Sequence, residues 1–325
     1  MKRIGFHGVG IAGLVGFARS LRTAVGRAAL AGLATFAALA ALPAAAQNEP
    51  PPAQLSGTLQ KVRETGAIAI GHRESSIPFS YRSARGEPIG YSIDLCKLLV
   101  EAIGEAVDRE IAIKWVPVTS ASRIDDVVSG KVDLECGSTT GNLERQKRVA
   151  FSPTMFVSGT KLLVKKGSAI KSFRDLGGKR VVVTAGTTNE QTMRALAARF
   201  KIDMVISVAP DHAASFALLA AGQADAFATD DVLLYGLLAQ HKAQADYVVT
   251  GDFLSYDPYG IMFRKGDAEL ARLVNDTFHR LAEDREIERR YNRWFLRKLP
   301  SGESLDLPMS AQLETIIQTM VARTE

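Results

Sequence analysis

The sequence has few of the residues that build catalytic and metal centres. It contains two cysteines, Cys96 and Cys136, and five histidines. The histidines are scattered without metal-ligand spacing, at His7, His72, His212, His241 and His279. Neither cysteine lies in a motif typical of a nucleophile, and adjacent acidic pairs such as Asp125–Asp126 give no general acid–base geometry. We therefore expect no catalytic residues, no metal and no cofactor.

The sequence also lacks an excess of charge once its N-terminal segment is set aside. Residues 1–46 carry 5 of the 40 Lys and Arg residues and none of the 35 Asp and Glu residues. The remainder therefore has 40 − 5 = 35 basic and 35 acidic residues, a formal net charge of zero. The sequence pI of about 9.2 comes from the N-terminal segment. We expect no basic face for nucleic acid.

A hydrophobic run long enough to span a membrane comfortably is missing too. Five basic residues precede an apolar run from Ala28 to Leu42, which is followed by P-A-A-A-Q. This order is typical of a signal peptide, so we expect cleavage after Ala46 and a periplasmic protein, with an uncleaved anchor as the alternative. The glycines of G-V-G-I-A-G at 8–13 lie inside this export segment with no strand before them. Their match to a dinucleotide-binding fingerprint is therefore a chance match.

Residues 47–57 read as a flexible tether, after which strands and helices alternate. The expected strands of a first unit are 67–71, 111–118 and 132–136, and its expected helices are 92–103 and 123–128. The expected strands of a second unit are 180–184, 204–208 and 224–228, and its expected helices are 190–200, 213–221 and 231–240. Strands that alternate with helices favour an α/β protein with mostly parallel sheets whose faces are covered.

Two extended segments, 155–164 and 259–264, follow the first and the second unit. They predict a discontinuous first lobe, a second lobe, and two hinge strands between them, with a ligand site in the cleft. The predicted first lobe comprises 58–157 and 257–325, and the second comprises 158–256 with the hinge crossings at its ends. An apolar stripe in 310–321 predicts a C-terminal docking helix.

The stretch E-C-G-S-T-T-G-N-L-E-R-Q-K-R at 135–148 is the most informative in the chain. A strand runs into the hydroxyls of Ser138, Thr139 and Thr140, and Arg145 follows on the next turn. Hydroxyl donors, free backbone N–H groups and a guanidinium at such a junction suit a carboxylate ligand. The alternative is a polar loop with threonine N-caps and a solvated arginine.

Two more arginines occupy places where a ligand would meet them. Arg73 follows the first strand, at the carboxyl edge where open α/β folds bind ligands, although it could instead pair with Glu74 or Glu87 on the surface. In T-S-A-S-R, Ser120 is a candidate cap and Arg123 lies in the first turn of a helix. An arginine there opposes the helix dipole, which indicates an external anion unless the side chain is solvated.

The second unit offers polar groups at its strand ends. Thr187 and Thr188 would lie at a helix N-terminus, as an anion site or as plain N-caps. Asp230 ends a strand, where it could take an ammonium group or cap the next helix. His212 begins a helix after Pro210, where an imidazole could meet a second carboxylate.

The segments GHRESS, PFSY, GYSIDLC, ECGSTT, ERQKRVAFS, VVVTAGTT and DHAASF occur in this order along the chain. In that order they resemble the periplasmic amino-acid-binding proteins of ABC importers (family 3 solute-binding proteins), over about residues 57–299. The resemblance implies the type II periplasmic-binding-protein fold and an inner-membrane ABC permease as partner. We also expect a monomer. The long leader and the cysteine pair depart from the family pattern, and the sequence leaves open whether Cys96 and Cys136 are bridged.

The same resemblance implies roles for the site residues. An α-carboxylate clamp falls on Arg145, Ser138, Thr140 and Thr188, and Asp230 takes the α-ammonium. Partners of a side-chain carboxylate fall on Arg73, Arg123 and His212, with Ser120 nearby.

Charge counting favours an acidic ligand independently. Three arginines and Asp230 give the proposed site a charge of +2, whereas L-glutamate or L-aspartate carries −1. A cationic ligand would face a like charge, and a neutral amide would leave Arg73 and Arg123 unpaired. The predicted function is capture of acidic L-amino acids for the permease. The alternatives are an exported dehydratase-like enzyme with Glu74 or Glu190 as its acid, and a receptor lobe that feeds a separate sensor.

Overall fold

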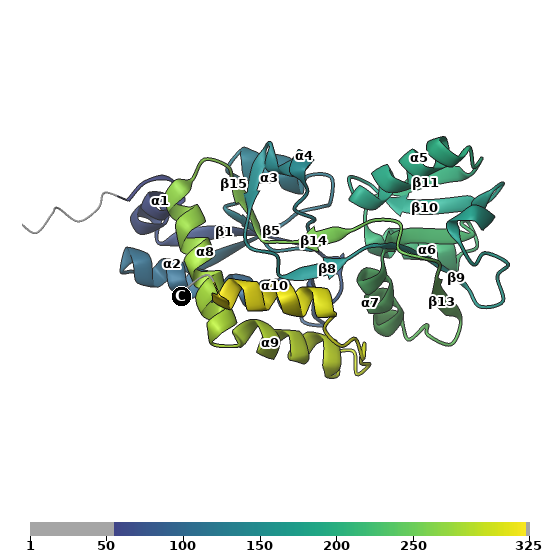
Figure 1. Cartoon of the computed structure of the whole chain (residues 1–325). Coiled ribbons are helices and arrows are strands. Elements are labelled where there is room, and N and C mark those ends of the chain that lie inside the picture. Colours follow the sequence, from purple (N-terminus) through teal and green to yellow (C-terminus); the bar gives the residue numbers. More distant parts are fainter. Residues whose placement is uncertain (1–54, 323–325) are drawn as a thin grey trace, which may run out of the picture. The chain divides into compact units, whose positions relative to one another are not determined.

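A computed structural model describes residues 55–322, which fold around two five-stranded sheets (Figure 1). The predicted signal peptide and residues 47–54 of the predicted tether lie outside the described residues, and Gly57, the last tether residue, begins the first helix. Within the described part of the chain, none of the helices combines the length and the apolar character that a membrane crossing requires.

The first sheet has the order β5-β1-β6-β15-β7. Strand β1 runs parallel to β5 and β6, as the alternation of strands and helices predicts. Strand β15, from much later in the chain, enters antiparallel between β6 and β7. The strands are β1 (Ala67–His72), β5 (Ala112–Pro117), β6 (Leu134–Glu135), β7 (Val149–Phe151) and β15 (Met262–Arg264).

The second sheet has the order β11-β10-β12-β9-β13 and repeats this arrangement. Strand β10 is parallel to β11 and β12, whereas β9 is antiparallel to both β12 and β13. The sheets are therefore mixed rather than wholly parallel. The strands are β9 (Thr160–Lys165), β10 (Arg180–Thr184), β11 (Val205–Ala209), β12 (Ala226–Asp230) and β13 (Tyr247–Thr250).

Two short strands, β8 (Phe156–Ser158) and β14 (Asp257–Tyr259), pair antiparallel with each other. Along the chain, β8 leads from the first sheet into β9 of the second, and β14 leads from the second sheet back to β15 of the first. Each predicted extended segment is interrupted. Residues 155–164 break at Gly159, between β8 and β9, and residues 259–264 break between Tyr259, which ends β14, and Met262, which begins β15. A Cβ at Gly159 would lie 2.3 Å from the backbone oxygen of Ser255. Glycine is needed there because the two connecting segments approach so closely.

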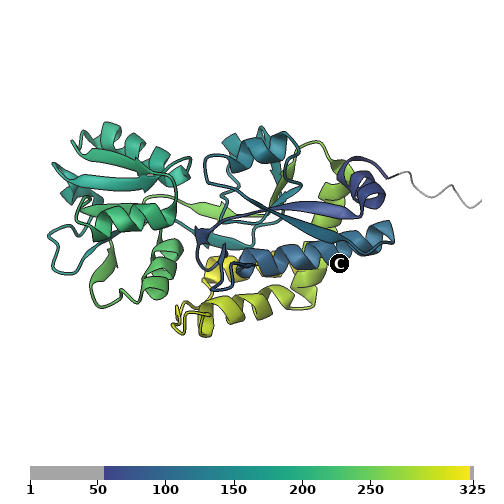
Figure 2. The same ribbon diagram turned by 180° about the vertical axis from the view of Figure 1, so that it is seen from behind.

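Helices cover the sheets, as the two opposite views show (Figures 1 and 2). Helix α8 illustrates why they dock: Leu270, Val274, Phe278 and Leu281 repeat at helical spacing and are buried. The helices are α1 (Gly57–Thr65), α2 (Tyr91–Val107), α3 (Arg123–Val128), α4 (Leu143–Gln146), α5 (Thr188–Phe200), α6 (His212–Ala220), α7 (Asp231–His241), α8 (Ala268–Glu283), α9 (Glu286–Tyr291) and α10 (Ala311–Ala322), with the short turns η1 (Phe173–Leu176) and η2 (Asn292–Leu296).

Helix α10 confirms the helix predicted at 310–321. Its buried residues Leu313, Ile317 and Met320 form most of the predicted apolar stripe, and it packs on α8 and β8. In contrast, the small sheet of β2 (Ser75–Ser76), β3 (Ser80–Arg82) and β4 (Pro88–Ile89) was not predicted. Strands of two or three residues are too short to show an alternating pattern.

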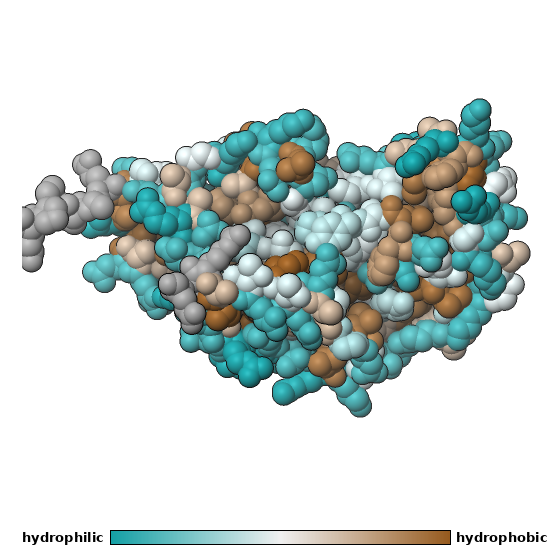
Figure 3. Space-filling view, in the orientation of Figure 1, coloured by the Kyte–Doolittle hydropathy of each residue, from teal (hydrophilic) through white to brown (hydrophobic). Residues whose placement is uncertain are grey.

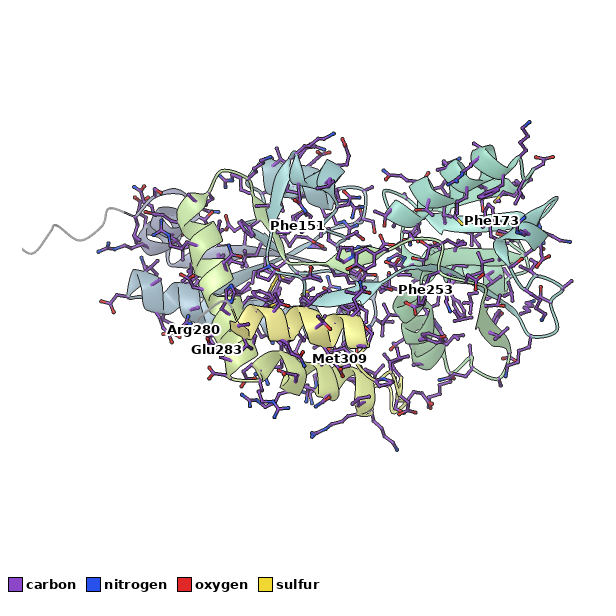
Figure 4. The ribbon with its side chains drawn as sticks, in the orientation of Figure 1. Phe151, Phe173, Phe253, Arg280, Glu283 and Met309 are labelled. Carbon is purple, nitrogen blue, oxygen red and sulfur yellow. A yellow bond between two sulfur atoms is a disulfide. The ribbon has the colours of Figure 1, made fainter. Side chains whose placement is uncertain are left out.

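The largest apolar cluster includes strand residues of both sheets, such as Ile68 of β1 and Val182 of β10. Two smaller clusters are separate from it: Phe173 belongs to one, with residues of the second sheet, and Phe151 packs against the other, with residues of the first. Figure 4 shows where these two phenylalanines lie. The face in Figure 3 is largely hydrophilic, with hydrophobic patches over the part that carries α5 and β11. Exposed Phe200, Val205 and Val208 belong to that part.

Candidate functional site

Three arginines from separate segments are buried close together. Arg73 follows β1, Arg123 begins α3 and Arg145 lies on α4, and their exposed fractions are 2%, 2% and 7%. Burial, and then the nearby Arg123, lower the pKa of both Arg73 and Arg145 to about 9. The pKa of Arg123 is lowered as well, mainly by burial. All three guanidinium groups stay charged at neutral pH, so the site favours an anion.

Arg73 is not part of the surface ion pair that was its alternative role. Glu74 instead pairs with Arg82, with 2.8 Å between Oε1 and Nε. The backbone of Arg73 donates to Ser80 Oγ at 2.9 Å. Its Nη1 is buried and has no hydrogen-bond partner among residues 55–322. A buried, unpartnered donor on a cation is what an anionic ligand would satisfy.

Arg123 points at the end of β6. Its Nη1 donates to Thr139 Oγ1 at 2.7 Å and to Ser138 O at 3.2 Å, whereas its buried Nε has no partner within the described residues. Ser122, not Ser120, is the N-cap residue of α3, so the predicted cap is wrong. Ser120 is buried instead, and its Oγ is likewise unpartnered in the described part of the chain.

The end of β6 is held by α2. Cys96 on α2 and Cys136 form a disulfide with 6.3 Å between their Cα atoms, which settles the open question about this pair. Ser92 of the same helix donates to Gly137 O at 2.7 Å. The next residue, Ser138, presents a buried Oγ without a partner in the described residues. Helix α2 therefore fixes the end of β6, and the Ser138 hydroxyl remains free to bind a ligand.

Arg145 joins segments that belong to the two sheets. Its Nη1 donates to Thr140 O at 3.0 Å, and its Nη2 donates to Gly186 O at 3.3 Å. The N-cap of its own helix, Asn142, accepts from the Arg145 backbone at 2.9 Å. This cap fixes where α4 starts and so directs the arginine inward.

The loop at 186–188 abuts the first sheet's loops. A Cβ at Gly186 would lie 2.6 Å from Ala121 Cα, and the φ of Gly186 is +71°. Thr188 Oγ1 lies 3.4 Å from Thr140 Oγ1. Thr187 is the N-cap of α5, since its Oγ1 accepts from Glu190 N at 3.1 Å. The capping alternative therefore applies to Thr187, whereas the half-buried Thr188 faces Thr140.

Asp230 precedes α7, but its side chain does not cap that helix. Its Oδ1 accepts from Asn189 Nδ2 at 2.7 Å, and its Oδ2 accepts from the hydroxyl of Tyr259. Burial and the neighbouring Asp257 raise the pKa of Asp230 to about 8. A carboxylate held this way can receive an ammonium group, which would relieve both unfavourable effects.

His212 begins α6 and is buried. Its Nδ1 lies 3.0 Å from Thr184 Oγ1. Burial, and then the positive charges of Arg73 and Arg123, hold the pKa of His212 well below its usual range. The imidazole is therefore neutral and adds no charge to the site.

Two buried carboxylates were missed by the sequence analysis. Glu135 is wholly buried on β6, and Asp257 is 2% exposed on β14. The predicted site charge of +2 counted Asp230 as the one acidic group. With Glu135 and Asp257 included, the charge is +3 − 3 = 0 when all six groups are ionised, and +1 while Asp230 holds its proton, which its pKa of about 8 favours at neutral pH. Glu135 stands in the stretch that drew attention for its hydroxyls, and its place on a buried strand was the available signal. Nothing in the sequence around Asp257 distinguishes it from a surface turn.

The orphan donors and acceptors define what the site can bind. Arg73 Nη1, Arg123 Nε, Ser120 Oγ and Ser138 Oγ are buried without partners in residues 55–322. They suit carboxylate oxygens, while Asp230 suits a cation. Residues 55–322 contain no group of three or more His, Cys, Asp or Glu side chains that could hold a metal ion.

Comparison with known proteins gives a consistent picture. A family model described as bacterial extracellular solute-binding proteins, family 3, matches residues 68–297. The chain is 46% identical over 267 residues to the L-glutamate/L-aspartate-binding protein of Pseudomonas aeruginosa, covering 81% of this chain and 88% of the relative. It is 41% identical over 263 residues to the glutamate/aspartate import solute-binding protein of Escherichia coli, covering 80% of this chain and 87% of that protein.

Solved structures of similar proteins share the fold. An ancestral arginine-binding protein bound to arginine matches with a TM-score of 0.65 and 30% identity, over 71% of this chain and 98% of that chain. An ancestral amino-acid-binding protein described as a precursor of cyclohexadienyl dehydratase matches with a TM-score of 0.63 and 32% identity, over 73% and 99%. These matches confirm the predicted type II periplasmic-binding-protein fold. The chain belongs to the bacterial extracellular solute-binding proteins, family 3.

Proposed function

We propose that this protein captures L-glutamate or L-aspartate in the periplasm and delivers it to the permease subunits of an inner-membrane ABC importer. The observation that carries the proposal is the group of three buried arginines with unpartnered donors beside Asp230. The relatives whose printed names include glutamate and aspartate support the same ligand class. We further propose export by a signal peptide cleaved after Ala46, and a monomer in solution.

The two sheets suggest how the chain divides. We assign residues 58–157 with 257–325 to one lobe and 158–256 to the other, with β8 and β14 in the hinge. Loop 186–188 of the second lobe meets the arginine-bearing loops of the first, which supports a ligand site at this junction. Ligand binding there would favour the closed arrangement of the lobes, which the permease would recognise.

We assign the ligand groups as follows. The α-carboxylate lies with Arg145, Ser138 and Thr188, and the α-ammonium lies with Asp230. The side-chain carboxylate lies with Arg73 and Arg123, near Ser120 and the neutral His212. Thr140 Oγ1 gives its proton to Asp257, at 3.0 Å, so its hydroxyl cannot also donate to a carboxylate.

A dehydratase-like enzyme would need a free acid in the site, and the two candidate acids are engaged elsewhere. Glu74 pairs with Arg82 on the surface, and Glu190 accepts from Gly186 N and pairs with Arg194. These contacts support a binding protein. Incubation with prephenate or arogenate, followed for aromatic product, provides the direct check, and product formation would favour the enzyme.

Calorimetric titration with each of the twenty amino acids tests the proposal. We expect binding of L-glutamate or L-aspartate and no comparable binding of cationic amino acids. Arg145→Ala should abolish L-glutamate binding while the circular dichroism spectrum is retained. The matched control is Arg148→Ala, because Arg148 lies three residues further on and pairs with exposed Asp125. Undiminished affinity in Arg145→Ala would refute the clamp.

Arg73→Ala should weaken L-glutamate binding by about 2–5 kcal/mol, because the side-chain carboxylate loses a buried charged partner. Weak binding of a neutral amino acid should survive, since that ligand does not use this arginine.

A further inference from the structure

Asp257 is a buried carboxylate for which the proposed ligand contacts leave no role. It begins β14, one of the two strands that connect the sheets, and only 2% of it is exposed. Its Oδ1 accepts from Thr140 Oγ1 at 3.0 Å, and its Oδ2 accepts from the hydroxyl of Ser255. Both oxygens are therefore engaged by hydroxyl donors from protein side chains.

The hydrogen bond to Asp257 fixes what Thr140 can offer to a ligand. A threonine hydroxyl has one proton, and an ionised carboxylate can only accept. The proton of Thr140 therefore lies toward Asp257, and the lone pairs of Thr140 Oγ1 remain. In the ligand-free protein the hydroxyl of Thr188, 3.4 Å away, is then the donor in that contact, and it would turn its proton to the α-carboxylate when the ligand binds. Toward a ligand, Thr140 Oγ1 is an acceptor for N–H.

A row of hydrogen bonds with fixed directions joins Asp257 to Asp230. Because Ser255 gives its proton to Asp257, its contact with Thr160 Oγ1 at 2.7 Å must be donated by Thr160. Thr160 Oγ1 in turn accepts from Asn189 Nδ2 at 2.7 Å, and the same amide nitrogen donates to Asp230 Oδ1 at 2.7 Å. The two carboxylates thus stand at the ends of one buried network.

Strand β14 contributes to both ends of this network. It carries Asp257, and it carries Tyr259, whose hydroxyl donates to Asp230 Oδ2. Asp257 also raises the pKa of Asp230, so the two groups interact electrostatically. If an ammonium group contacts Asp230 and Thr140 Oγ1, both of these groups are therefore held by hydrogen bonds to β14.

We propose that Asp257 is a positioning residue for the α-ammonium group of the bound amino acid, because it orients Thr140 Oγ1 as an acceptor and links Asp230 to β14. This inference rests on the proposed function. It predicts that removing the charge of Asp257 weakens recognition of the ammonium and does not weaken recognition of the two carboxylates, because Asp257 opposes the positive charge of Arg145.

The test compares L-glutamate with glutarate, which keeps both carboxylates and lacks the ammonium. In Asp257→Asn, titration calorimetry should show a dissociation constant for L-glutamate raised by about 10- to 100-fold, the range for a buried hydrogen bond to a charged group. The constant for glutarate should change less than about threefold. Asp252→Asn, the same substitution at an exposed aspartate five residues earlier, should change neither.

A double-mutant cycle gives a second readout that depends on L-glutamate alone. Because Asp257 acts partly through Thr140 and partly through the network to Asp230, the loss caused by Asp257→Asn should be smaller in a Thr140→Val background than in the unmodified protein. Additive losses would overturn the positioning role, and so would equal losses for both ligands or no loss for L-glutamate. If the unmodified protein binds neither L-glutamate nor L-aspartate, the proposed function itself fails, which is a different outcome.

Discussion

Thr139 Oγ1 donates its proton to Glu135 Oε2 over 2.5 Å, and Thr139 Oγ1 itself accepts from Arg123 Nη1 at 2.7 Å. A single hydroxyl thus connects a buried anion to a buried cation that do not form a direct ion pair. Glu135 also interacts favourably with Arg73 and Arg145. We conclude that the negative charge of Glu135 stabilises the three arginines, which are buried close together.

Glu135→Gln should therefore destabilise the ligand-free protein more than the complex. Removing one partner of a buried charge group costs about 3–5 kcal/mol at most, and a glutamine retains the shape and one acceptor. We expect a lower free energy of unfolding in urea and a larger rise in melting temperature on addition of L-glutamate. Glu74→Gln, at an exposed ion pair, is the control, with an expected effect of about 0–1 kcal/mol. Weaker L-glutamate binding in Glu135→Gln would contradict this role.

Binding of L-glutamate should release a proton. The pKa of Asp230 is raised to about 8, first by burial and then by Asp257, so below that pH the ligand-free carboxyl holds its proton. An ammonium group favours the ionised form. The affinity for L-glutamate should therefore rise between about pH 6 and about pH 8, by at most about tenfold per pH unit.

Glutarate separates this effect from the other titrating groups. The three arginines and His212 act on the carboxylates that both ligands share, whereas the ammonium is present in L-glutamate alone. The dissociation constant of L-glutamate divided by that of glutarate should therefore fall as the pH rises, because only the L-glutamate complex depends on the ionisation of Asp230. Calorimetry in buffers of different ionisation enthalpy counts the released proton directly, and a ratio independent of pH would argue against the ammonium contact.

A side chain at Gly186 should hold the ligand-binding segments apart. A Cβ there would lie 2.6 Å from Ala121 Cα, across the junction of the segments that supply the arginines. Gly186→Ala should weaken L-glutamate binding by at least about tenfold, or about 1.4 kcal/mol, while the circular dichroism spectrum is unchanged. Gly178→Ala is a matched control, because Gly178 also has a positive φ, of +68°, but a Cβ there would meet nothing within 4 Å. Equal losses in both variants would mean that backbone strain, not contact, is responsible.

The disulfide between Cys96 and Cys136 should contribute measurably to stability. The two residues are 40 positions apart, and closing a loop of that size in the unfolded chain stabilises the folded state by about 2–4 kcal/mol. Replacing both cysteines by serine should lower the free energy of unfolding by that amount in urea titrations. Reductant should have a comparable effect on the unmodified protein and none on the variant. An unchanged unfolding midpoint would show that the strand end is held by Ser92 alone.

The arginines of the site could be predicted from their places at strand ends and at the start of a helix. Arg123 stands in the first turn of a helix, and Arg145 follows a run of hydroxyls at a strand end, so both indicate an anion. The partners of these side chains could not be predicted in the same way. Asp257 meets Thr140 only because a connecting strand returns beside the loop after β6, and that meeting depends on the path of the whole chain.

The fold shows the same limit. The strands with long apolar runs, such as β10 at Arg180–Thr184, were predicted with their bounds. The antiparallel insertions of β9 and β15 were not, since nothing local in a strand states the direction of its neighbours. The lobe boundaries at 157–158 and 256–257 follow from the predicted crossings and stay a prediction.

Strand β15 lies between β6 and β7, although it follows both of them by more than a hundred residues in the chain. Strands β6 and β7 therefore cannot complete their hydrogen bonds until β15 has been added. Residues 158–256 come before β15 in the chain as one uninterrupted stretch. The second sheet can assemble as soon as it has emerged, and the first closes last.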